Sequence, residues 1–305
     1  MSFSYDTKAE LTRVAIGQKC CAVSECYGLL LYCNTFSARG VRIITESREL
    51  ALRLPKLFRR AFDLTFDNVP ELSAKAGKLT FFVDDPEKLG RIFETFGLAG
   101  GQMIAHHLNL GVLEDECCRP SFLRGAFLAG GSVINPAKRY HLELVTDHYN
   151  VSRETYSLLL EMGFEPKEAT RKGNFINYFK QSLAIEDFLT TIGAPVSAMT
   201  LMSQKIEKDM RNSINRMVNC DTANVSKMVD AAISQIDAIN KLDAVIGIAS
   251  LPDKLRETAE LRRNNPEMSL SELADASQMT KSCLNHRMRK LLETAGRLTS
   301  GAEKI

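Results

Sequence analysis

The stretch SFLRGAFLAGGSVINP, residues 121–136, decides the fold of this chain. Gly125 and Ala129 lie among apolar residues, and two further glycines precede a short apolar run. Glycine costs a helix roughly 1 kcal/mol relative to alanine, so its place inside a helix needs a compensating reason. A close approach of two helix backbones is such a reason. The stretch therefore predicts a helix that packs closely against a second helix and then leads into a strand.

A second stretch of the same kind, SECYGLLLYCNT, occupies residues 24–35. Matching residues recur at a near-constant offset: Gly28 and Gly125 lie 97 apart, Thr45 and Thr146 lie 101 apart, and Gly97 and Gly193 lie 96 apart. Strand and helix patterns follow each stretch in the same order. In the first half these are strand 41–47, helix 48–62, strand 77–85 and helix 86–97; in the second they are strand 140–148, helix 150–164, strand 174–182 and helix 184–193.

This repetition predicts two duplicated α-β-β-α-β-β-α halves, and hence an α+β fold. Their two sheets would form one saddle about a pseudo-twofold axis, where the glycine-bearing helices meet. The simpler alternative is a pair of ordinary buried helices with incidental glycines.

Bulk composition leaves the function open. The 305 residues suffice for about two domains, and 39 basic against 37 acidic residues give a net charge of only +2. We find no signal peptide and no run of the ~20 apolar residues that a membrane span needs, so we expect a cytoplasmic protein without a membrane partner. The eight cysteines include two adjacent pairs and no C-x-x-C spacing. We therefore expect reduced, structural thiols, no metal and no cofactor.

The carboxyl-terminal segment predicts a helix-turn-helix. Its first helix covers 251–265, and its second covers 269–277 and begins with a capping box formed by Ser269 and Glu272. The third is expected to begin at Thr280 or Lys281, to run to about Ala295 and to stop at Gly296. Gln278 stands where such turns usually have glycine, so the turn must adopt its angle at some cost or differ in shape.

Helical phase sorts the third helix into two faces. Leu284, Met288, Leu291, Leu292 and Ala295 share the face that should pack on the other two helices. Residues 280–297 hold five basic residues and one acid, a local charge of +4. The predicted DNA-contacting residues are Thr280, Lys281, Ser282, Asn285, His286, Arg287, Arg289 and Lys290.

Roles within this set follow from position. Residues near the start of a recognition helix reach base edges, which assigns base reading to Lys281, Ser282, Asn285 and His286. Arg287, Arg289 and Lys290 are expected to bind phosphates. A solvated basic face on a purely structural three-helix unit is the alternative.

The paired helices resemble the motif helices of LAGLIDADG homing endonucleases, whose saddle of two sheets lies on DNA. In active members of that class an acid near the end of each motif helix binds the catalytic metal. By position those acids fall here on Cys33 and Gly130, and neither is a carboxylate. Magnesium requires hard oxygen ligands, so we expect no catalytic residues and no enzyme activity.

The chain as a whole resembles the WhiA family of bacterial transcription regulators, which join a degenerate LAGLIDADG domain to a helix-turn-helix. The resemblance is carried by LRGAFLAGGSVINP (123–136), NRMVNCDTANVSK (215–227) and SLSELADASQMTKSCLNHRMRKL (269–291). It implies a non-enzymatic, sequence-specific DNA-binding regulator of cell division or sporulation. The implied partners are double-stranded DNA and, as a further expectation, other transcription regulators, with the protein associated with the nucleoid.

These patterns divide the chain into a LAGLIDADG-like domain over 1–204, with halves of about 1–110 and 111–204, a helical linker over 205–250 and a helix-turn-helix domain over 251–305. The linker should contain two helices or one broken helix, because NCDTAN (219–224) is rich in turn formers. Two alternative functions stay open: an active or RNA-processing nuclease, with acids at 84–85 or 114–116 as substitutes, and a protein-interaction scaffold built on the old saddle. Basic residues on the saddle, such as Arg171, Lys172 and Lys180, allow DNA contact there without requiring it.

Overall fold

A computed structural model describes residues 2–71, 77–98 and 106–302, which form two units, Met1–Asp209 and Met210–Ile305. The first unit, called the large unit below, contains both predicted halves. The second, called the small unit, contains the predicted helix-turn-helix. The helix α8, Pro195–Ile246, has residues in each unit. Within the described ranges, no helix is long and apolar enough to cross a membrane.

The second half of the first unit has the complete predicted order. Its elements are α5 (Cys118–Gly130), β4 (Gly131–Val133), β5 (Leu142–Thr146), α6 (Tyr149–Glu161), β6 (Lys167–Arg171), β7 (Asn174–Phe179) and α7 (Ser182–Ile192). The four strands form an antiparallel sheet in the order β4-β5-β7-β6. Along β5 buried and half-buried residues alternate, so one face of the sheet packs on helices.

The first half repeats this plan with a shorter sheet. Its elements are α2 (Lys19–Leu31), β1 (Thr35–Ser37), β2 (Gly40–Thr45), α3 (Arg48–Phe62), β3 (Leu79–Val83) and α4 (Pro86–Thr95). Its sheet has the order β1-β2-β3, and a single bridge between Asn68 and Phe82 occupies the position of the fourth strand. α1 (Phe3–Leu11) precedes this half, and the short 3-10 helix η1 (Leu110–Leu113) leads into the next. The duplication and the predicted fold class are confirmed.

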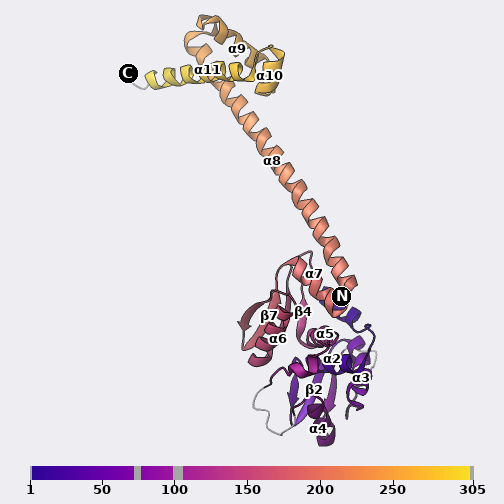
Figure 1. The fold of residues 1–305 in the computed structure, drawn as a ribbon. Coiled ribbons are helices and arrows are strands. Elements are labelled where there is room, and N and C mark those ends of the chain that lie inside the picture. The colour runs from indigo at the N-terminus through magenta and orange to yellow at the C-terminus, as the bar shows by residue number, and fades with distance from the viewer. Residues whose placement is uncertain (1, 72–76, 99–105, 303–305) are drawn as a thin grey trace. The chain divides into compact units, whose positions relative to one another are not determined.

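The halves meet along α2 and α5, which lie side by side in the middle of the unit (Figure 1). The glycines contact the opposite backbone reciprocally. A Cβ at Gly28 would lie 2.0 Å from the carbonyl oxygen of Phe122, and a Cβ at Gly125 would lie 2.0 Å from that of Glu25. Close backbone approach is therefore the reason for both glycines, as the sequence predicted.

A buried ion network crosses this contact. The carboxylate of Glu25 on α2 accepts from Arg53 on α3 at 2.7 and 2.9 Å and from Arg124 on α5 at 2.9 Å. Arg124 also donates to the carbonyl of Ile192 at the end of α7, at 3.1 Å. Both arginines and the glutamate are buried, so each charge depends on its partners for compensation.

α8 is one continuous helix, and the expected interruption at 219–224 is wrong. Asn219, Asp221, Thr222 and Asn224 are exposed within it. Such residues cost a solvated helix only about 0.7 kcal/mol each at most, too little to break it without proline or glycine. The start of α8 is capped by α1, since the Glu10 carboxylate accepts from the backbone N–H groups of Val196 and Ser197 at 2.7 and 2.9 Å.

The second unit packs three helices around the end of α8. These are α9 (Asp253–Asn264), α10 (Leu270–Ala276) and α11 (Lys281–Ala302), preceded by the 3-10 helix η2 (Ile248–Ser250). Ile239 and Leu242 of α8 join the core with Leu255, Met288 and Leu291. The predicted stop of the last helix at Gly296 is wrong: α11 continues to Ala302, because one exposed glycine lowers helix stability without ending the helix.

Candidate nucleic-acid interface

Side-chain caps fix the starts of α10 and α11, the second and third helices of the helix-turn-helix. Ser269 and Glu272 form the predicted capping box, with bonds of 3.2 Å from the Glu272 N–H to the Ser269 hydroxyl and 2.7 Å from the Ser269 N–H to the Glu272 carboxylate. Thr280 caps α11, since its hydroxyl accepts from the Cys283 N–H at 3.2 Å. Both helices therefore begin at defined residues.

Packing sets the rotation of α11. Leu284, Met288, Leu291 and Ala295 are buried against the other helices, and Leu292 is partly buried beside them. This is the predicted core face. The opposite side of the helix must then face solvent.

The solvent side carries most of the predicted contact set. Thr280, Lys281, Ser282, Asn285, His286, Arg289 and Lys290 are all exposed. In the part of the chain that the structure describes, the side chains of Lys281, Ser282, Asn285 and Lys290 form no hydrogen bond or ion pair. Arg289 lies 3.4 Å from the His286 ring and 3.7 Å from Glu293, both exposed contacts worth at most about 1 kcal/mol. The structure thus brings together a strip of polar and basic groups with free bonding capacity.

Arg287 lies apart from this strip. Its side chain is only 17% exposed and donates to the Lys254 carbonyl at 3.4 Å and the Glu257 carboxylate at 3.3 Å, both on α9. These contacts join the first and third helices. A phosphate would have to compete with them for this guanidinium.

Arg262 is a positioning residue that the sequence analysis missed. It is 2% exposed, and its guanidinium donates to the carbonyls of Met268 at 2.6 Å and Asn265 at 3.3 Å. These bonds hold the loop that leads from α9 into α10. Burial lowers the pKa of Arg262. Arg262 and Arg263 are adjacent in the last turn of α9, where arginines are ordinarily surface residues, so the sequence carried no signal for this role.

Of the two outcomes that the sequence left open for the turn between α10 and α11, the structure has the strained one. Gln278 has a φ of 54°, the left-handed region that favours glycine. Its side chain is exposed. The requirement at position 278 is therefore a backbone with positive φ, and the glutamine side chain makes no buried contact there.

Replacing Gln278 with glycine is expected to stabilise the small unit by about 1 kcal/mol, because glycine adopts a positive φ without a Cβ penalty. Gln278→Ala is the matched control, since alanine keeps the penalty and should give no gain. The stabilities of both variants are measured by urea unfolding and, separately, by hydrogen exchange of the α10 and α11 amides. Equal stabilities for the two variants would contradict a left-handed residue at 278.

The large unit has no carboxylate at positions 33 and 130, where a cutting centre of this class would hold its metal. A Cβ at Gly130 would lie 2.4 Å from the Val145 carbonyl oxygen and 2.9 Å from the Tyr32 ring, so no side chain fits there. Burial raises the pKa of the Cys33 thiol to about 12, and its sulfur donates to the Thr35 carbonyl at 3.3 Å. A protonated thiol and an absent side chain provide no hard oxygen ligand for magnesium.

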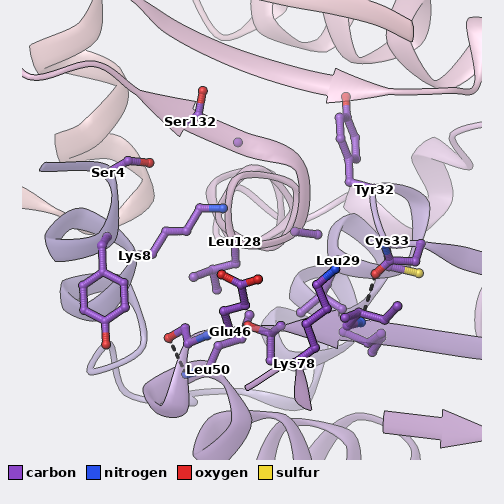
Figure 2. Close-up of a pocket in the computed structure, with 18 of the residues that line it drawn as sticks. Ser4, Lys8, Leu29, Tyr32, Cys33, Glu46, Leu50, Lys78, Leu128 and Ser132 are labelled. Atoms are coloured by element: carbon purple, nitrogen blue, oxygen red, sulfur yellow. Dashed lines mark hydrogen bonds between the residues drawn. The ribbon is translucent and has the colours of Figure 1, made fainter. Parts of the chain in front are cut away.

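A pocket of about 580 Å³ opens where these two helix ends meet. Figure 2 shows Lys8 reaching toward the end of α5, with Cys33 and Glu46 on other sides of the pocket. Burial lowers the pKa of Lys8 to about 8. Of the described residues that line the pocket, Glu46 is the sole carboxylate, and it faces two lysines, Lys8 and Lys78. This set suits no divalent cation.

Among the substitute acids considered from the sequence, Asp85 has a structural task. Asp85 caps α4 by accepting from the N–H groups of Glu87 and Lys88 at 2.9 and 3.1 Å, and the N–H groups of Asp84 and Asp85 both donate to Asp67. Of residues 114–116, Asp115 lies beside cysteines just before α5 begins, whereas the pocket is lined by Leu128 and Ala129 at the other end of that helix.

Among the basic residues predicted on the second sheet, Arg171 is paired with an acid. Arg171 at the end of β6 pairs with Glu143 on β5 at 3.3 Å, and Glu143 also lies 3.2 Å from His141. Burial raises the pKa of Glu143, but the bonds from His141 and Arg171 outweigh burial and hold this pKa below its usual value. Lys180 lies 5.1 Å from the centre of the Tyr178 ring. Glu143 therefore offsets the charge of Arg171, whereas Lys180 keeps its charge beside the ring.

Comparison with known proteins gives a consistent result. A family model described as the WhiA C-terminal HTH domain matches residues 214–295, and one described as the WhiA LAGLIDADG-like domain matches residues 119–211. A protein of Ruminiclostridium cellulolyticum named "Probable cell division protein WhiA" is 37% identical over 317 residues and covers all of both chains. One of the same name from Staphylococcus haemolyticus is 36% identical over 314 residues, covering 100% of this chain and 99% of that one. The solved structure of full-length DUF199/WhiA from Thermotoga maritima matches 97% of this chain and 99% of that chain, with a TM-score of 0.60 and 24% identity, which supports the fold.

Proposed function

Because this chain belongs to the WhiA family, we propose that it is a non-enzymatic, sequence-specific DNA-binding regulator that acts in the control of cell division. The name of its relatives and the match to a helix-turn-helix family model support this role. The observation that carries the proposal is the exposed strip on α11, in which the side chains of Lys281, Ser282, Asn285 and Lys290 have no hydrogen-bond or ion-pair partner among the described residues. Such a strip on the third helix of this motif suits the major groove.

We divide the proposed contacts by side-chain chemistry. Lys281, Ser282, Asn285 and His286 at the start of α11 read bases, and the Asn285 amide can bond adenine with two hydrogen bonds. Arg289 and Lys290, one turn later, bind phosphates. Thr280 caps α11, and we assign it a contact with the DNA backbone beside the start of that helix. We propose that Arg287 mainly joins α11 to α9, because it bonds two residues of α9, and that contact with DNA is its lesser role.

The proposed division of labour follows the three sequence segments. Residues 251–305 read DNA, residues 205–250 link, and residues 1–204 form a saddle that no longer cuts. The protein would act on the nucleoid, where the saddle could contact DNA or another transcription regulator. The lost oxygen ligands at positions 33 and 130 support a saddle without nuclease chemistry.

The test begins with the DNA that the protein selects from fragmented genomic DNA, followed by affinity measurements at several salt concentrations. Arg289→Ala with Lys290→Ala should weaken binding to selected and random DNA alike. Two lost phosphate contacts should lower the slope of log affinity against log salt by about 1.8, because each contributes about 0.9. Lys56→Ala with Arg59→Ala, two exposed basic residues on α3, makes the same charge change and should leave the slope unaltered.

Asn285→Ala tests base reading in the same assay. Affinity for the selected sequence should fall by about 1–3 kcal/mol, roughly 5- to 150-fold, with little change on random DNA. Equal losses on both kinds of DNA would contradict the assignment of Asn285 to a base. Magnesium-dependent cleavage of the duplex by the same preparation, abolished by a chelator, would instead favour the nuclease alternative.

A further inference from the structure

Four ligand atoms from cysteine and aspartate side chains gather at the amino-terminal ends of α2 and α5. The sulfurs of Cys20 and Cys117 lie 3.9 Å apart, and the Cys118 sulfur lies 4.0 Å from a carboxylate oxygen of Asp115. One ligand atom from each of these four residues lies within 4.8 Å of all the others. The sequence alone left these cysteines as two unrelated pairs; the fold brings them together.

The cluster follows the internal duplication of the chain. Cys20-Cys21 and Cys117-Cys118 are separated by 97 residues, the same offset as Gly28 and Gly125. Each adjacent pair stands at the start of its motif helix. The reciprocal glycine contacts hold the two helices together, and this contact brings one cysteine pair against the other.

The backbone that carries the cluster is held by matching hydrogen bonds in both halves. Ser24 donates to the carbonyl of Cys20 at 2.9 Å, and Ser121 donates to that of Cys117 at 2.8 Å. The Cys118 N–H donates to the Asp115 carbonyl at 2.9 Å, which closes the turn before α5. The backbone that carries the ligands is therefore held by hydrogen bonds within the fold.

The spacing suits a tetrahedral ion bound by thiolates. Zn–S bonds of about 2.3 Å at the tetrahedral angle place two sulfurs about 3.8 Å apart, close to the 3.9 Å between Cys20 and Cys117. A disulfide would require about 2.05 Å between them. Three thiolates and a carboxylate are a soft, anionic donor set that favours zinc over magnesium or calcium. The amino-terminal ends of two helices favour the negative charge of these ligands.

We propose that Cys20, Cys117, Cys118 and Asp115 form a zinc site that joins the two halves of the large unit at the end of the helix pair opposite the old cutting centre. Each thiol loses its proton as its sulfur bonds the ion, and the Asp115 carboxylate completes the tetrahedron. Cys117 is exposed and Cys20 partly so, so the ion can enter and exchange from solution. The site is structural: it links elements 97 residues apart in the chain.

The reduced full-length protein, stripped of metal, is titrated with Co²⁺ as a spectroscopic probe and then with Zn²⁺. One Co²⁺ per chain should give thiolate-to-cobalt charge-transfer absorption and the strong visible bands of a tetrahedral ion, and Zn²⁺ should remove both. Cys20→Ser and Cys117→Ser should each lose these bands. Asp115→Asn should keep the thiolate absorption but lower the affinity for Co²⁺ at least about tenfold. Loss of a group that only supports a ligand already lowers metal affinity by about 10- to 100-fold, and loss of a ligand should lower it by no less.

Two control variants define the donor set. Cys21→Ser alters the neighbouring thiol, whose sulfur lies 3.9 Å from the Cys117 carbonyl, and Cys283→Ser alters an exposed cysteine of α11; both should bind Co²⁺ as the parent does. Zn²⁺ should also raise the unfolding midpoint of the parent but not of Cys117→Ser. Absence of thiolate bands in the reduced parent, or their loss only in Cys21→Ser, would overturn the proposal. So would ready oxidation to a Cys20–Cys117 disulfide in a protein that takes up no metal when reduced.

Discussion

Gly125→Ala is expected to destabilise the large unit by at least about 3 kcal/mol, the upper end of the usual cost of overpacking. The added methyl carbon would lie 2.0 Å from the Glu25 carbonyl oxygen and 2.8 Å from the Leu29 nitrogen. These are backbone atoms of α2, which cannot swing aside as a flexible side chain can. The two helices would have to separate, and the buried residues along both would lose packing.

Hydrogen exchange measured by mass spectrometry should locate this effect, with faster exchange in the amides of α2 and α5. Gly28→Ala should behave alike, since its contact with Phe122 mirrors that of Gly125 with Glu25. Gly90→Ala is the matched control: Gly90 lies within α4, and no atom lies near its added Cβ. It should stabilise the protein by about 1 kcal/mol through helix propensity. Similar responses at Gly90 and Gly125 would show that α2 and α5 do not touch as described.

Glu25→Ala is expected to cost about 3–5 kcal/mol of folding stability, the usual result of removing one partner from a buried ion pair. Arg53 and Arg124 would then be left buried without their shared carboxylate, although each keeps hydrogen bonds to backbone carbonyls. Chemical unfolding followed by circular dichroism measures the loss; the chain has no tryptophan to report it by fluorescence.

Glu161→Ala provides the comparison for that variant. Glu161 pairs with Arg119 at 3.4 Å on the surface, where both side chains are more than a third exposed. Surface pairs contribute about 0–1 kcal/mol, so the two glutamate variants should differ severalfold. A loss at Glu25 no larger than that at Glu161 would mean that water reaches the Arg53 and Arg124 guanidinium groups.

The sequence predicted the fold wherever glycine and apolar periodicity were strong. Gly28 and Gly125 indicated a close helix pair, and Gly97 and Gly193 recur with positive φ values of 67° and 100° at matching helix ends. Other parts carried no such signal. All five residues of β6 are polar or small and exposed, so nothing in their pattern indicates a strand; pairing with β7 alone makes it one. α8 shows the opposite error, because turn formers in an exposed helix weaken it without ending it.

The candidate interface was predictable in part for the same reason. Helical phase separated the buried from the exposed face of α11, because a single period governs both. It could not show that Arg287 bonds α9 or that Arg262 holds the loop before α10, since these contacts join separate helices. The cysteine cluster was out of reach likewise: a ligand set assembled from two duplicated segments has no local spacing to find.

The packing around Gly130 limits what a single substitution can do at the end of α5. Any side chain at that position would bring its Cβ within 2.4 Å of the Val145 carbonyl oxygen and 2.9 Å of the Tyr32 ring. An acid introduced there would therefore disturb the backbone of β5 before it could offer an oxygen ligand to a metal. Room for a carboxylate would require β5 and the end of α2 to move away at the same time.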